Sequence, residues 1–150
     1  MSTFTDTNNR TWSIDPVVST LKRVKRLTND AVDLYRLDDE ELIRKLRTDP
    51  YLLVDTLFAA VQPQAEAAGV SDEAFAASLG GDTLERATAA LLEAVADFFP
   101  SRKAQVLKKS LAKMRQTEDV FLEAAESQVE VFDAEEAARQ ELDALKNSGG

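Results

Sequence analysis

The chain has 150 residues, carries a formal net charge of −9 and contains no cysteine and no histidine. These absences exclude disulfides, thiolate and histidine metal sites, and the serine-histidine and cysteine-histidine catalytic groups, so we expect no enzyme and no cofactor. A hydrophobic fraction of 44% is that of a globular domain, and no uncharged apolar stretch approaches the roughly 20 residues of a membrane span.

The chain opens with two short stretches, residues 3–5 and 10–14, that alternate polar and apolar side chains, which predicts two β-strands. Turn-forming residues, Asp6 to Asn9, lie between them. Phe4, Trp12 and Ile14 fall on one face of this hairpin. Because an isolated hairpin is marginal in water, we expect that face to pack on helices or the strands to pair with a partner's sheet.

Helix starts follow, each marked by a residue suited to a helix N-terminus. The expected starts are Asp15 before Pro16, Asp38, Asp49 before Pro50, Ser71, Asp82 and Ser101. Proline lacks the N–H and clashes with the preceding turn, so Pro63 should bend or end the helix that contains it. Gly69, Gly80-Gly81 and Pro100 should close the segments before them. The expected fold class is mainly α, with a helical core, a short N-terminal β-hairpin and a long C-terminal helical tail.

No helix breaker occurs from Ser101 to Lys146, so a single helix there would be roughly 69 Å long. A compact domain of this size does not need such a rod. We therefore expect a hairpin plus helical core domain in residues 1–116. Residues 117–150 form an acidic amphipathic helical tail that ends in a frayed segment, Asn147 to Gly150.

Charge is unevenly distributed along the chain. Residues 101–116 carry six basic groups and no acidic ones, whereas residues 117–150 carry two basic and ten acidic groups. An acidic chain repels nucleic acid and anionic membranes, so we expect neither as a partner. A candidate basic face for docking a protein consists of Lys22, Arg23, Lys25, Arg26, Arg102, Lys108 and Lys109. The basic stretch 102–115 could also pair with acidic groups of its own tail or of a neighbouring copy, and the second case would give a homo-oligomer.

Large apolar residues persist in the acidic tail, beyond what a freely solvated helix needs. Their spacing between Val120 and Leu145 is typical of a helix that lays an apolar stripe into a partner's groove. A merely solvated helical end is the other reading of the same segment. The candidate partner-binding residues are Phe121, Val129, Phe132 and Leu142.

Several short motifs carry a resemblance to a known family. They are Phe4 with Arg10-Thr11-Trp12, the run from Asp49 to Asp55, the run from Gln64 to Phe75, Gly81-Asp82, and Phe98-Phe99-Pro100. In this order, over roughly residues 4–115, the chain resembles small helical proteins encoded among tail genes of phages and prophages. That group is similar to the tail assembly chaperones of long-tailed phages. The motifs are helix caps and core positions, and they assign no binding residue.

This resemblance implies a non-catalytic assembly factor that acts in the host cytoplasm. Chaperones of this family coat the tape-measure protein, keep it soluble and extended, and recruit tail-tube subunits. Many are made in two lengths by a translational frameshift, and the acidic tail could serve like the extension of the longer form. The expected partners are therefore a tape-measure protein and a tail-tube protein.

Two alternatives from other classes remain open. One is a structural tail or connector component of the virion, whose Trp12 hairpin adds to a neighbour's sheet. The other is a small nucleic-acid-binding regulator that uses residues 22–26 and 102–115, and it predicts DNA binding that falls steeply with salt.

Overall fold

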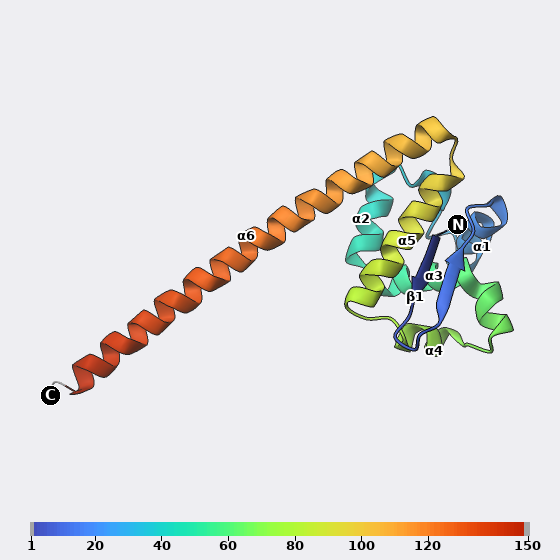
Figure 1. Cartoon of the computed structure of the whole chain (residues 1–150). Helices are drawn as coiled ribbons and strands as arrows, with labels where there is room; N and C mark the ends of the chain where they lie inside the picture. Colours follow the sequence, from blue (N-terminus) through green and yellow to red (C-terminus); the bar gives the residue numbers. More distant parts are fainter. Residues whose placement is uncertain (1, 149–150) are drawn as a thin grey trace. The chain divides into compact units, whose positions relative to one another are not determined.

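The computed structural model describes residues 2–148 and confirms a mainly helical fold with a two-stranded N-terminal hairpin and a long C-terminal helix (Figure 1). Along the chain the elements are β1 (Ser2–Thr5), β2 (Thr11–Ile14), α1 (Val18–Leu27), the 3-10 helix η1 (Leu34–Arg36), α2 (Glu40–Thr48), α3 (Pro50–Ala67), α4 (Asp72–Ala77), α5 (Asp82–Phe98) and α6 (Ser101–Ser148). By contacts the chain forms two compact units, Met1–Lys109 and Ser110–Gly150. The change of charge used above to divide the chain lies later, at residue 116.

The hairpin packs on helices, as its apolar face predicts. β1 and β2 pair antiparallel with Phe4 opposite Trp12, and Phe4, Trp12 and Ile14 are all buried. β1 lies against α5 and β2 against α3. The backbone amide of Thr7 in the turn donates to the carbonyl of Ser78, 3.1 Å away. Both the face and the turn of the hairpin are therefore held by the helical core.

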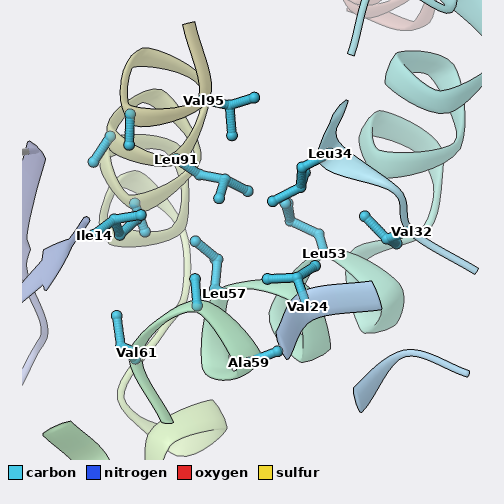
Figure 2. Packing of buried hydrophobic residues seen from close by; sticks show 14 of the residues in the cluster. Ile14, Val24, Val32, Leu34, Leu53, Leu57, Ala59, Val61, Leu91 and Val95 are labelled. Atoms are coloured by element: carbon cyan, nitrogen blue, oxygen red, sulfur yellow. The ribbon is translucent and has the colours of Figure 1, made fainter. Parts of the chain in front are cut away.

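Helix α3 is the centre of the N-terminal unit, since it contacts α1, α2, α4, α5 and β2. Its Leu57 and Val61 are completely buried, and Figure 2 shows them among side chains from α1, η1 and α5. Phe75 of α4 is also completely buried, and its ring lies 5.3 Å from Trp12 and 5.5 Å from Phe58. This aromatic cluster joins the hairpin to α3 and α4.

Two of the predicted helix starts are confirmed by their cap hydrogen bonds. The Asp49 carboxylate accepts from the amide of Leu52 at 3.1 Å, and the Ser71 hydroxyl accepts from the amide of Ala74 at 3.1 Å. The last helix also begins where expected, although Ser101 is its first residue.

The starts of α1 and α2 lie one to three residues later than expected. Helix α1 begins at Val18 with Val17 as its N-cap, because the chain first makes a tight turn in which the amide of Val17 donates to the carbonyl of Asp15 at 2.9 Å. The amide of Asp39 donates to the carbonyl of Arg36, so the preceding turn extends to Asp39, and it is this carboxylate that caps α2.

Helix α5 begins at Asp82 as expected, but Asp82 is not its cap. Its N-cap is Gly81, whose φ of +54° glycine adopts without strain. Asp82 is therefore the first residue inside the helix, where the helix dipole favours its charge.

Pro63 does not end α3, because the helix continues to Ala67. The hydrogen bond that the proline cannot make is replaced by another donor. Without an N–H, Pro63 cannot donate to the carbonyl of Ala59 four residues earlier. The guanidinium of Arg23, on α1, donates to that carbonyl instead, with Nε at 2.7 Å, and to the Ala60 carbonyl with Nη2 at 2.8 Å. A side chain from a neighbouring helix thus compensates for the proline.

The first turns of α6 belong to the N-terminal unit. Ala104 and Leu107 are buried there, and the Lys103 ammonium lies 4.4 Å from the centre of the Phe99 ring. Within residues 2–148, no helix combines the length and the apolar character needed to cross a membrane.

Candidate functional site

The four candidate partner-binding residues all lie on α6 in the unit Ser110–Gly150, and all are exposed. Their exposed fractions are 71% for Phe121, 65% for Phe132, 58% for Val129 and 59% for Leu142. Among residues 115–147 only Ala125 is half-buried, and the others are exposed. Single exposed apolar residues are common on protein surfaces, but several large ones together indicate a surface that binds a partner.

The positions of these residues around the helix follow from 3.6 residues per turn. Viewed along the helix axis, Phe121, Phe132 and Val129 lie within an arc of about 80° that begins at Phe121. Leu142 lies outside this arc, about 60° from Phe121 in the opposite direction. The structure therefore places three of the four candidates on one side of a straight helix. Leu142 is on the adjacent side.

The same side of α6 carries further apolar residues towards its start. We call this set the apolar stripe; it consists of Leu111, Met114, Phe121, Ala125, Val129 and Phe132. Val120 is outside it, because nine residues, or two and a half turns, separate Val120 from Val129. The stripe is interrupted by one charged residue, Glu118.

Acidic side chains lie on the part of the helix away from the stripe. Asp119, Glu123, Glu126, Glu130 and Asp133 all project at about 80° or more from its centre, by the same helical geometry. Residues 111–133 therefore carry an apolar stripe on one side and most of their acidic residues elsewhere, although Val120 and Val131 also project away from the stripe. Such a helix suits a partner that offers an apolar groove, with basic groups at its edge.

The seven candidate basic residues do not form one surface of free cations. Lys22, Lys25 and Arg26 are exposed, and their spacing of three and four residues puts them on one side of α1. Arg23 is half-buried against α3; burial, and then the neighbouring Arg26, lower the pKa of its guanidinium.

The remaining three candidates lie near the start of α6. Lys108 forms an ion pair with Asp97, and this contact raises the pKa of Lys108. Arg102 and Lys109 are exposed. The structure thus leaves Lys22, Lys25 and Arg26 as the group that could dock a partner together, while Arg23 has a structural contact that its position in a basic run did not predict.

The outer edge of β2 already forms hydrogen bonds within the chain. This matters for the alternative in which the hairpin adds to the sheet of a neighbouring protein. The side-chain amide of Gln64 in α3 accepts from the Ser13 backbone amide at 3.0 Å and donates to the Ser13 carbonyl at 2.7 Å. It therefore occupies the two backbone groups that an added strand would need at this residue.

Sequence reasoning treated Asp6 only as a turn residue and missed its central position. Its carboxylate is buried and accepts hydrogen bonds from the Trp12 indole at 3.0 Å, from Arg10 Nε at 2.8 Å, and from the backbone amides of Asn8 and Arg10 at 2.9 Å each. Burial alone would raise its pKa, but these hydrogen bonds outweigh burial and lower the pKa to about 2. An aspartate that precedes a short turn is a weak signal for such a carboxylate.

Among residues 2–148 no three acidic side chains come close enough together to hold a metal ion. Comparisons with protein-family models, with curated proteins and with solved structures find no match to this chain. The strongest candidate site is therefore the apolar stripe of α6, on the basis of its geometry alone.

Proposed function

We propose that this protein is a non-catalytic assembly factor of the phage tail assembly chaperone type, which binds a tape-measure protein in the host cytoplasm and helps to recruit tail-tube subunits. The observation that carries the proposal is the exposure of Phe121, Val129 and Phe132 on one side of α6. The resemblance of residues 4–115 to small proteins of phage tail gene clusters supplies the identity of the partners.

The physical basis is the covering of one helix by another. A tape-measure protein is long and helical with an apolar side, and it aggregates when that side is bare. The apolar stripe of α6 can cover such a surface, while the acidic residues on the rest of the helix contribute the charge that keeps a complex soluble.

The binding must also be reversible, because tube subunits later take the place of the chaperone. Exposed ion pairs contribute only about 0–1 kcal/mol each, so the apolar residues determine most of the affinity and the charges determine orientation. The stripe has few large residues and is interrupted by Glu118. These features favour many weak contacts over one tight contact.

The test is co-expression of the full chain with the products of neighbouring tail genes, the tape-measure protein among them. We expect the tape-measure protein to become soluble and to co-purify with the full chain. The double variant Phe121→Ser, Phe132→Ser should lose most of this effect, and Val120→Ser should keep it, because Val120 lies outside the stripe.

Circular dichroism of each variant separates lost binding from lost folding. Equal capture of the tape-measure protein by the double variant and by the unmodified chain would contradict the assignment of the stripe. If the protein remains in purified particles, it is a structural tail component instead.

A further inference from the structure

We propose that residues 111–132 of α6 pair antiparallel with the same residues of a second copy of this chain. The two helices would cover each other's apolar stripe when no other partner is bound. This inference concerns the free protein and does not depend on the proposed function.

A helix that pairs with the apolar stripe must come from another molecule. Residues 101–148 form one continuous α-helix and contain neither proline nor glycine. A continuous helix cannot fold back on itself, so the basic stretch at its start cannot reach the acidic residues beyond Phe121 in the same chain. Contacts within one helix join residues three or four apart only.

The two ends of the stripe have the same spacing when the helix is reversed. From the N-terminal end it begins with Leu111 and, three residues on, Met114; from the C-terminal end it begins with Phe132 and, three residues back, Val129. In an antiparallel pair Leu111 therefore lies opposite Phe132 of the second copy and Met114 opposite Val129. The centre of the pair falls at Phe121 and Leu122.

Charge favours the antiparallel over the parallel direction. Residues 101–116 carry six basic groups and no acidic ones, whereas residues 117–148 carry ten acidic and two basic groups. A parallel pair would place like charges side by side along the whole helix. The antiparallel pair places the basic start of each helix beside the acidic end of the other, and Lys113 near Glu130.

The size of the contact suits a reversible dimer. The segment 111–132 is about 33 Å long, or about three heptads, which is a short coiled coil. Glu118 lies within the stripe and would face Ala125 of the second copy. A charged residue at such a position reduces stability while it fixes register.

The first test measures the mass of the full chain by light scattering after gel filtration over a range of concentrations. We expect a monomer at low concentration and a dimer at high concentration. Val129→Ser should raise the dissociation constant at least tenfold, and Val120→Ser should leave it nearly unchanged. The two valines have similar exposed fractions, 58% and 61%, and the substitution is the same, but they lie on opposite sides of the helix.

The second test determines direction with a short bis-maleimide cross-linker, since the chain has no cysteine of its own. In an antiparallel pair the two copies of residue 114 are roughly 22 Å apart. Met114→Cys alone should therefore not cross-link, whereas a mixture of Met114→Cys and Val129→Cys chains should. In a parallel pair Met114→Cys would cross-link to itself.

Salt gives an independent readout. Raising the salt concentration screens the complementary charges, so the antiparallel dimer should dissociate, whereas a parallel dimer would become stronger. A monomer at every concentration, equal effects of Val129→Ser and Val120→Ser, or cross-linking of Met114→Cys alone would overturn the proposal. Capture of the tape-measure protein is measured separately, so either idea can fail without the other.

Discussion

The buried carboxylate of Asp6 accepts a hydrogen bond from the indole nitrogen of Trp12, with 3.0 Å between the two atoms. Trp12 lies at the middle of the hairpin, opposite Phe4, and its ring contacts Phe75. One carboxylate therefore links the turn of the hairpin to the aromatic cluster that attaches it to the helices.

The stability of the protein should depend on the charge of Asp6. Its pKa is lowered from 3.8 to about 2 in the folded chain, so the ionised carboxylate stabilises the folded state above pH 3.8, and this contribution is lost as the pH falls towards 2. A shift of this size corresponds to about 2 kcal/mol.

Urea unfolding tests this with the variant Asp6→Asn. Its free energy of unfolding should be lower than that of the unmodified chain by about this amount at pH 7, and the difference should shrink below pH 3.8. The exposed Asp55→Asn should change stability by less than about 0.5 kcal/mol at either pH. A difference between Asp6→Asn and the unmodified chain that is the same at pH 7 and pH 3 would exclude this explanation.

Trp12→Ala should destabilise the protein by about 3–5 kcal/mol, because it removes a buried ring from the aromatic cluster. Trp12→Phe should cost less, since it keeps a ring in the cluster and loses the hydrogen bond to Asp6. Thermal unfolding followed by circular dichroism measures both, because the only tryptophan fluorophore is lost in each variant. An unchanged melting temperature for Trp12→Ala would mean that the hairpin is peripheral to the fold.

Arg23 and Pro63 should be coupled in a double-mutant cycle. Arg23→Ala leaves the Ala59 carbonyl without a donor and removes the additional hydrogen bond to the Ala60 carbonyl, and it should cost about 1–3 kcal/mol. In the Pro63→Ala background the new backbone amide can donate to Ala59, so the same arginine substitution should cost about 1 kcal/mol less. The exposed Arg26→Ala is the matched control and should show no coupling to Pro63. Additive effects of Arg23→Ala and Pro63→Ala would show that the guanidinium does not replace the missing helical bond.

Deletion of residues 117–150 should leave the N-terminal unit folded. The described residues of this segment, up to Asn147, are exposed apart from the half-buried Ala125, so their removal takes little from the core. The melting temperature should change by only a few degrees, while partner capture and dimer formation should both be lost. A large fall in melting temperature would show that the acidic segment supports the fold, and unchanged capture would move the binding surface to the N-terminal unit.

Local sequence signals were enough to predict the hairpin, the caps at Asp49 and Ser71, and the long helix from Ser101. These features depend on residues close together in the chain, such as a side chain that caps an amide three positions later, and on alternation along a strand. The exposure of Phe121, Val129 and Phe132 could be anticipated for a related reason. A long helix with no breaker and many charges has no folded neighbour in its own sequence to cover its apolar residues.

Other features were decided only by the tertiary structure, because they depend on groups that are far apart in the sequence. Pro63 is tolerated inside α3 since Arg23 arrives from α1 with two donors, and the Gln64 side chain can serve β2 only because the strand lies against that helix. Asp6 binds residues close to it in the sequence, Arg10 and Trp12, but its burial follows only from the packing of the hairpin on the helices. Burial and long-range hydrogen bonds exist only once the chain has folded, and no local pattern records which distant donor will satisfy a given acceptor.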